Sequence, residues 1–102
     1  MSSRMSLSEE DPGRIKVSGL LSVETVAGYQ VEGLTLLEKT GDVVIFDLCE
    51  AEIVGSAAIA LLISWQRRAI KLNKTFVIEN APSHLLDVAD VTGVRQIIAF
   101  KS

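Results

Sequence analysis

The chain has 102 residues, about the size of one domain, and we expect residues 1–102 to fold as a single unit. Apolar residues make up 48% of the sequence, which is typical of a globular protein and argues against a disordered one. The net charge is −3, and the few Lys and Arg clusters are small. This pattern argues against nucleic acid as a partner, because no basic stripe is long enough to follow a phosphate backbone.

The sequence favours a cytoplasmic location. Its one cysteine, Cys49, excludes an internal disulfide and fits a reducing compartment. The first fourteen residues contain three acidic side chains and no apolar stretch of the kind that a signal peptide needs. The longest apolar run, residues 57–63, is far shorter than the roughly 20 residues that cross a bilayer, so we expect no direct membrane insertion.

The N-terminal part predicts a β-hairpin followed by a helix. Residues 5–8 alternate weakly, Pro12 and Gly13 form a turn signal, and residues 14–18 alternate polar and apolar side chains as a half-buried strand does. Ser22 is a suitable cap for a helix from Val23 to about Glu38. Gly33 lies inside that helix and weakens the prediction.

The remaining elements alternate strand and helix. A continuous apolar run at 43–48 predicts a central strand buried on both faces, and a connector at 49–55 leads to a helix at 56–71. A strand at 75–79, a helix from about 81 to 92 that ends at Gly93, and a short strand at 96–100 follow. The order ββαβαβαβ predicts an α/β fold with a mixed sheet, parallel crossovers and helices covering the sheet.

One segment carries a family resemblance. Asp47-Leu48 ends a strand and leads by a short loop to Ile53-Val54-Gly55-Ser56 at a helix start, which resembles the signature of the STAS domain family. The likeness extends over nearly the whole chain and implies a STAS-like mixed sheet in a non-catalytic module that docks onto a partner protein. This chain has Gly55 where the family has Asp, and it has Ala57 and Ala58 where the family has small glycine positions.

A narrower likeness implies a specific role. The run at 60–63, the residues Trp65-Gln66-Arg67-Arg68 and the end of the third predicted helix are similar to the branch of the family that serves the Mla phospholipid ABC transporter. That resemblance implies an accessory subunit that binds the MlaF-like cytosolic ATPase subunit and reaches the membrane permease only indirectly. Such a subunit supports assembly and activity of a transporter that maintains outer-membrane lipid asymmetry.

The second predicted helix is apolar on nearly all sides, whereas a helix that covers a sheet in a free monomer has a polar outer face. If Ile59, Leu62 and Ile63 face the sheet, a second apolar stripe remains outside and is available to a partner. The alternative is that Trp65 packs under a neighbouring element. The expected partner-binding residues are Val54, Gly55, Ser56, Ala57, Ala60, Leu61, Ser64, Trp65 and Arg68.

Ser56 has two readings. A serine at a helix start usually caps the helix, at a value of about 1 kcal/mol. The same position favours a phosphate, so Ser56 is a possible phosphorylation site, and the chain is then an anti-sigma factor antagonist controlled by a partner kinase. The missing Asp at position 55 favours the capping reading.

The sequence predicts no catalytic, cofactor-binding or metal-binding residues, so we do not expect an enzyme. Asp47 lacks the additional carboxylates that a receiver-type phosphoacceptor needs for Mg²⁺. His84 has no serine or cysteine nucleophile in a matching pattern, and Cys49 has no metal-ligand spacing to another Cys or His. Glycine-rich phosphate loops are also missing.

Overall fold

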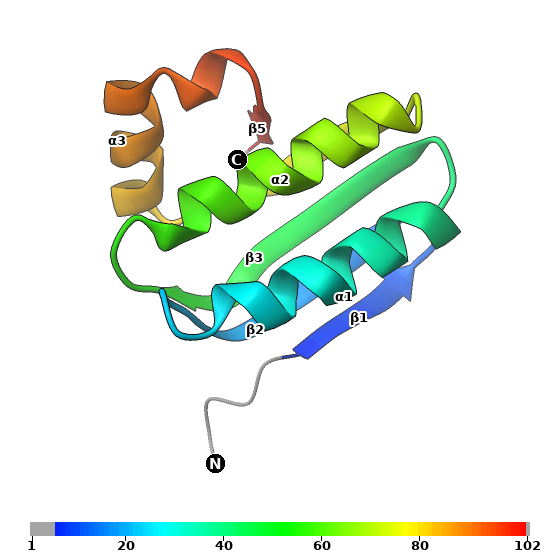
Figure 1. The fold of residues 1–102 in the computed structure, drawn as a ribbon, viewed down its shortest axis with the longest axis horizontal. Coiled ribbons are helices and arrows are strands. Elements are labelled where there is room, and N and C mark those ends of the chain that lie inside the picture. Colours follow the sequence, from blue (N-terminus) through cyan, green and yellow to red (C-terminus); the bar gives the residue numbers. More distant parts are fainter. Residues whose placement is uncertain (1–5, 102) are drawn as a thin grey trace.

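A computed structural model describes residues 6–101 of the chain, and its element order is the predicted ββαβαβαβ with one added 3₁₀ turn (Figure 1). Met5, the first residue of the predicted hairpin, lies outside the described residues. The elements are β1 (Ser6–Asp11), β2 (Arg14–Leu21), α1 (Val26–Lys39), β3 (Val43–Ile53), α2 (Ala57–Lys71), β4 (Thr75–Glu79), α3 (Ser83–Thr92), the 3₁₀ turn η1 (Val94–Gln96) and β5 (Ala99–Lys101).

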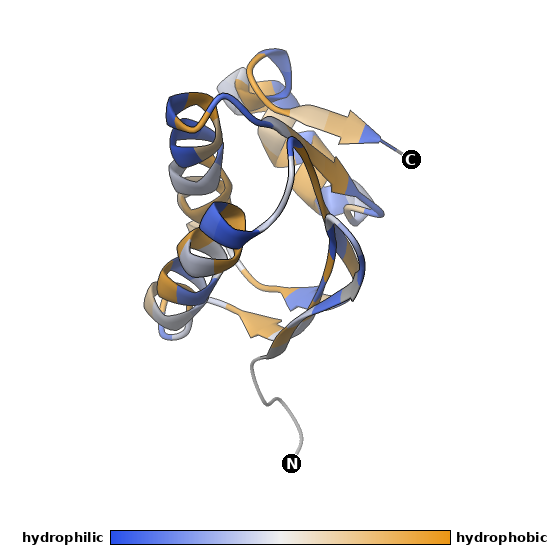
Figure 2. Cartoon of the chain, turned by 90° about the vertical axis from the view of Figure 1, so that its right-hand side faces the viewer, coloured by the Kyte–Doolittle hydropathy of each residue, from blue (hydrophilic) through white to orange (hydrophobic). Residues whose placement is uncertain are grey.

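The five strands form one mixed sheet in the order β1-β2-β3-β4-β5, in which only the β1–β2 pair is antiparallel. β3 is the central strand, as predicted. The prediction that this strand is buried on both faces is wrong, because its buried side chains alternate with exposed or half-buried ones. Figure 2 shows the reason: α1 and α2 pack on the same face of the sheet, so the opposite face stays open.

β3 is longer than predicted and contains a bulge. Lys16 of β2 pairs with Asp47, whereas Ser18 pairs with Glu50, so β3 has one residue more than β2 between these pairs. Such an extra residue shifts the inward side chains from one parity to the other. The strand continues through most of the predicted connector and ends at Ile53. Before the bulge the even-numbered Phe46 and Leu48 point inward, and after it the odd-numbered Ile53 does so.

The end of α3 agrees with prediction, whereas β5 and α1 start later than predicted. α3 ends at Gly93, which has φ +80°, as the sequence predicts. The chain then forms η1 before it enters the sheet, so β5 starts at Ala99 and not at Gln96. α1 starts at Val26 and not at Val23, because the carbonyl of Ser22 accepts hydrogen bonds from the amides of Thr25 and Val26 in a preceding turn.

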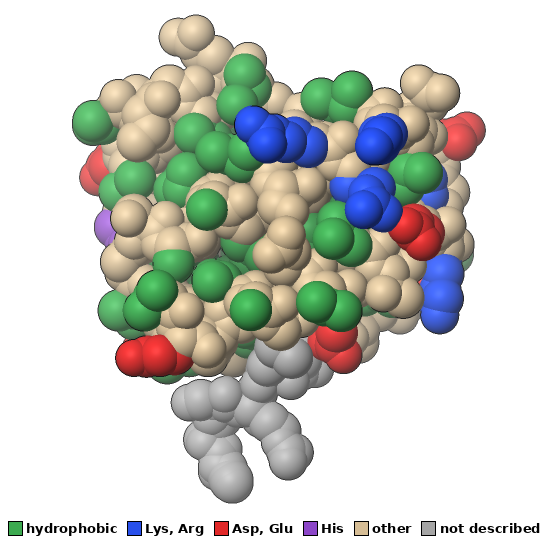
Figure 3. Space-filling view, viewed as in Figure 1, with side chains coloured by type: hydrophobic (Ala, Val, Ile, Leu, Met, Phe, Trp, Pro, Cys, Tyr) green, Lys and Arg blue, Asp and Glu red, His purple; other side chains and the backbone are tan. Residues whose placement is uncertain are grey.

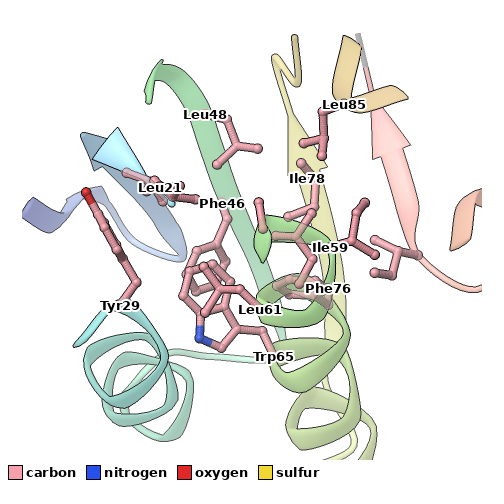
Figure 4. Packing of buried hydrophobic residues seen from close by; sticks show 14 of the residues in the cluster. Leu21, Tyr29, Phe46, Leu48, Ile59, Leu61, Trp65, Phe76, Ile78 and Leu85 are labelled. Carbon is pink, nitrogen blue, oxygen red and sulfur yellow. The ribbon is translucent and has the colours of Figure 1, made fainter. Parts of the chain in front are cut away.

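Trp65 is the largest fully buried side chain, and it joins α2 to both the sheet and α1 (Figure 4). Its indole stacks on Phe46, with ring centroids 4.4 Å apart, and Phe46 contacts Phe76 edge to face. On the α1 side the indole lies against Gly33, where a Cβ atom would be 2.2 Å from the ring. The ring nitrogen also donates a hydrogen bond of 3.4 Å to the carbonyl of Gln30. Gly33 is thus what permits α1 to approach α2.

The prediction that Leu61 and Trp65 lie on an exposed stripe of α2 is wrong, since they are only 3% and 0% exposed. Ile59 and Leu62 are buried as predicted, but Ile63 is only half-buried. The buried stripe is rotated toward α1 because Gly33 leaves room there for the indole. The alternative reading, in which Trp65 packs under a neighbouring element, is the correct one. The residues that α2 buries are Ala58, Ile59, Leu61, Leu62, Trp65 and Ala69.

On the open face of the sheet, an ionic cluster ties three strands together. The Arg14 guanidinium of β2 bonds to Asp47 of β3 at 3.2 Å and to Glu79 of β4. Asp47 also accepts hydrogen bonds from the Asn80 side chain at 2.8 Å and from the Cys49 amide at 2.9 Å. Burial raises the pKa of Asp47, but these hydrogen bonds and the Arg14 charge together outweigh burial, and the pKa lies below its ordinary value.

We expect Gly33→Ala to destabilise the protein by about 2 kcal/mol or more, since the steric overlap with Trp65 outweighs the gain in helix propensity of roughly 1 kcal/mol. Denaturant unfolding measures this. Gly28→Ala, at an exposed position of the same helix, is the matched control and should stabilise slightly. In a Trp65→Phe background the cost of Gly33→Ala should shrink, because the smaller ring withdraws from the new methyl group. If the free-energy costs of Gly33→Ala and Trp65→Phe simply add in the double variant, the proposed clash between the new methyl group and the indole is contradicted.

Asp47→Asn should lower the free energy of unfolding near neutral pH, because the amide cannot replace the carboxylate beside Arg14. A carboxyl with a depressed folded pKa stabilises the fold above its unfolded pKa and loses that contribution as the pH falls through the folded value. The difference in the free energy of unfolding between wild type and variant should therefore shrink as the pH falls below 3.8, the ordinary pKa of an Asp side chain. Denaturant unfolding over a pH series measures it, with the exposed Asp90→Asn as control. An undiminished difference at the most acidic pH where both proteins fold would contradict the assignment.

Candidate docking site

Three loops meet at the carboxyl ends of the parallel strands β2 and β3. The amide of Val54, after β3, donates to the carbonyl of Leu21 at 3.0 Å and so ties the β3–α2 loop to the β2–α1 loop. From the start of α3, a ring nitrogen of His84 lies 3.0 Å from the carbonyl of Ile53. In open α/β sheets, ligands bind outside the carboxyl ends of the strands, although the strand order here has no reversal of the kind that usually marks the position. The fold therefore presents the loop before α2 at a position suited to recognition.

Most of the expected partner-binding residues are accessible. Val54 is 51% exposed, Gly55, Ser56 and Ala60 are exposed, and three more are half-buried: Ala57, Ser64 and Arg68. Leu61 and Trp65 belong to the core instead. From here on, "the docking surface" means Val54, Gly55, Ser56, Ala57, Ala60, Ser64 and Arg68.

Gly55 has a conformational reason to be glycine. Its φ is +74°, a left-handed value that other residues adopt at a cost, while a Cβ atom there would meet nothing within 4 Å. The backbone turn, and not a lack of space, therefore selects glycine at the position where the family resemblance predicts Asp. The turn reverses the chain and places Ser56 at the first position before α2.

Ser56 does not form the predicted capping hydrogen bond. It occupies the N-cap position of α2, and its carbonyl accepts from the Ile59 amide at 3.0 Å, but its side chain makes no capping hydrogen bond. Ser56 is exposed, and its hydroxyl forms no hydrogen bond within residues 6–101. The hydroxyl is thus available to a partner.

The neighbouring loop adds a residue that sequence reasoning missed. Val23 is 77% exposed and lies in the turn before α1, next to Ser22, whose hydroxyl accepts from the Glu24 amide at 3.3 Å. The sequence predicts Val23 as the start of the first helix, so no local pattern indicates its exposure in a turn. Val23 and Val54 give the convergent loops two exposed apolar side chains.

The reactive side chains near this edge are engaged in structural contacts. Asp47 is held in the ionic cluster, and His84 contacts a backbone carbonyl. Burial, followed by the neighbouring Asp47 and Glu50 charges, raises the pKa of the Cys49 thiol and so disfavours its thiolate. Among residues 6–101, no three His, Cys, Asp or Glu side chains are grouped as metal ligands would be. None of the helices described is both long and apolar enough to traverse a bilayer.

Solved structures with similar folds fall into two groups. A chain of the Acinetobacter MlaFEDB complex in an ATP-bound conformation is 21% identical, with a TM-score of 0.80 over 94% of this chain and 99% of that one. An anti-sigma factor antagonist from Mycobacterium paratuberculosis is 16% identical, with a TM-score of 0.79 over 98% and 87% of the two chains. The unphosphorylated anti-sigma factor antagonist SpoIIAA is 12% identical, with a TM-score of 0.73 over 97% and 89%.

These likenesses confirm the predicted STAS-type fold. Among curated proteins, none matches this sequence significantly. The family model described as "Mlab, STAS domain" matches residues 6–99. Since that match spans nearly all of the 102 residues, the chain belongs to the MlaB family of STAS domains.

Proposed function

We propose that this chain is a non-catalytic accessory subunit of a phospholipid-transporting ABC system and that it binds the cytosolic ATPase subunit through the docking surface. The family match and the likeness to a chain of the MlaFEDB complex support this role. In this role the protein is cytoplasmic and peripheral to the inner membrane, and it reaches the permease only through the ATPase. Its contribution is to the assembly and activity of the transporter.

One observation carries the proposal: the loop before α2 and the first turns of α2 expose apolar and small side chains that the fold does not cover. Val54 is half exposed at the tip of the loop, and Ala60 is exposed one turn into the helix. Small residues let a partner approach the helix backbone closely, and exposed apolar side chains gain most from burial against a partner. Ser56 lies between them with a free hydroxyl donor.

We expect Val54→Asp and Ala60→Glu each to weaken binding of the cognate ATPase subunit by about 2 kcal/mol or more, because each places a charge in an apolar contact. Neither residue is buried, so the thermal melting temperature of the isolated domain should change little. Calorimetry with the purified ATPase subunit measures affinity, and a thermal melt of each variant controls for folding.

Val91→Asp is the matched control, since Val91 is an 88% exposed valine on α3 and lies outside the docking surface. It should bind like wild type. Leu61→Asp should instead fail to fold, because Leu61 is buried. Wild-type affinity in both Val54→Asp and Ala60→Glu would place the ATPase contact elsewhere on the domain.

A second function is favoured by one observation, the exposed and unbonded hydroxyl of Ser56. In an anti-sigma factor antagonist of this fold, a partner kinase phosphorylates such a serine and releases the complex. The solved structures of similar fold include SpoIIAA in its phosphorylated form, at 12% identity. Gly55, in place of the family's Asp, and the apolar Ala57-Ala58 flank count against this reading for our chain.

Ser56→Ala should change the free energy of unfolding by less than about 0.5 kcal/mol, because no capping hydrogen bond is lost. If the accessory role is correct, the ATPase subunit should bind this variant, and intact-mass measurement of protein from the native host should show no phosphate on Ser56. A phosphorylated Ser56, together with loss of a sigma-regulating partner in Ser56→Asp, would favour the second function.

A further inference from the structure

A groove of about 550 Å³ runs between α1 and α2 on the helix-covered face. Its apolar floor consists of Leu34 from α1 and Ala60 and Ile63 from α2. The Gln30 side chain donates a hydrogen bond of 2.9 Å to the Ser64 hydroxyl across the groove. The buried Trp65 holds the same two helices together beneath it. The groove is thus preformed and does not depend on a partner to open it.

One end of this groove is strongly basic. Figure 3 shows Lys and Arg side chains gathered over the C-terminal half of α2, and Arg67, Arg68 and Lys71 line the groove there. Arg68 pairs with Glu38, whereas Arg67 and Lys71 form no ion pair within residues 6–101. Three of the ten Lys and Arg residues therefore line one groove in a chain whose net charge is −3.

The groove residues of α2 recur at helical spacing, from Ala60 at one end to Lys71 at the other. They form the stripe opposite the buried one, and they change along the helix from small and apolar to cationic. At 1.5 Å per residue, this stripe is roughly 16 Å long, which corresponds to about three turns of a second helix. A helix that docks in such a groove presents an apolar face to the floor and its flanks to the rim.

We propose that this groove binds an acidic amphipathic helix of the ATPase subunit, with apolar residues on Leu34, Ala60 and Ile63 and carboxylates beside Arg67 and Lys71. The inference rests on the proposed function for the identity of the partner. It also extends the docking surface, because Ala60, Ser64 and Arg68 belong to both. The apolar residues at one end of the groove and the two unpaired cations at the other end together complement a helix of this chemistry.

An anionic membrane surface fits these observations less well. Basic patches that bind such membranes usually gather four to eight Lys and Arg residues, roughly, and this groove has three. Its floor residues Leu34 and Ile63 are half-buried inside a hollow and do not project toward a lipid layer. Lipid binding is therefore an outcome that the experiment must separate from helix binding.

The test is the double charge reversal Arg67→Glu/Lys71→Glu, measured as affinity for the purified ATPase subunit. We expect at least about tenfold weaker binding with an unchanged thermal melt, and a shallower dependence of affinity on salt. The control Lys16→Glu/Lys101→Glu changes the net charge by the same amount, but at two positions on β2 and β5 that lie outside the groove. It should bind like wild type. A photo-crosslinker at position 71 should capture an Asp- and Glu-rich helical segment of the ATPase subunit. Wild-type affinity of the groove variant would overturn the inference and leave the proposed function intact.

If the wild-type domain does not bind the ATPase subunit, the proposed function fails, and a peptide decides the groove separately. The probe is a three-turn helical peptide with leucines on one face and glutamates on both flanks, beside a version with lysines in place of the glutamates. The acidic peptide alone should shift the amide NMR signals of Leu34, Ala60 and Ile63, and the groove variant should abolish the shift. No shift at millimolar peptide, or groove-dependent sedimentation with phosphatidylglycerol vesicles, would overturn the inference.

Discussion

The contact between Trp65 and Gly33 determines how the helical layer of this domain is built. The indole occupies the volume that a Cβ atom at position 33 would take, and its other face stacks on Phe46 of the central strand. One side chain thus sets both the spacing of α1 from α2 and the rotation of α2 on the sheet. The exposed stripe of α2 follows from it, because a helix that turns Leu61 and Trp65 inward must turn Ala60, Ser64 and Arg67 outward.

The same arrangement separates side chains that hold the fold together from side chains that stay accessible. The helices cover one face of the sheet, and the open face is crosslinked by Arg14, Asp47 and Glu79. The ionisable groups that sequence analysis weighed as reactive are engaged in holding strands or loops together. Accessible side chains on α2 and on the loop before it include Val54 and Ala60, and also Arg67 and Lys71, which form no ion pair within residues 6–101.

Elements with strong local signals were predictable from the sequence. The β-branched run that starts at Val43 predicted the central strand, and Gly93 marked the end of α3. The position of α2 was also predictable, but its rotation was not. Nearly all sides of its first turns are apolar, so periodicity alone does not distinguish Ile63 from Leu61 as the inward residue. The deciding fact is tertiary: the glycine at position 33, which lowers helix propensity locally, faces Trp65 from 32 residues away in the chain.

The candidate site was predictable only where a local sequence pattern indicates it. The loop from Val54 to Ser56 precedes a helix that the sequence indicates clearly, and these residues are exposed as expected. The missing capping bond at Ser56 and the exposure of Val23 depend on backbone angles and on the pairing of two distant loops, which leave no local pattern in the sequence.

The bulge in β3 gives the two halves of that strand opposite polarity patterns. Before it, even-numbered residues such as Phe46 and Leu48 point inward; after it, Ala51 and Ile53 do so, while Glu50 and Glu52 face water. The extra residue therefore moves the inward positions of the strand from even-numbered to odd-numbered residues. A homologous chain that lacked this residue would alternate without interruption and would keep the residues equivalent to Ala51 and Ile53 inward, so no later position of the strand would need to change its character. Sequence alignments across this strand must therefore place a gap at the bulge and not in the loop that follows.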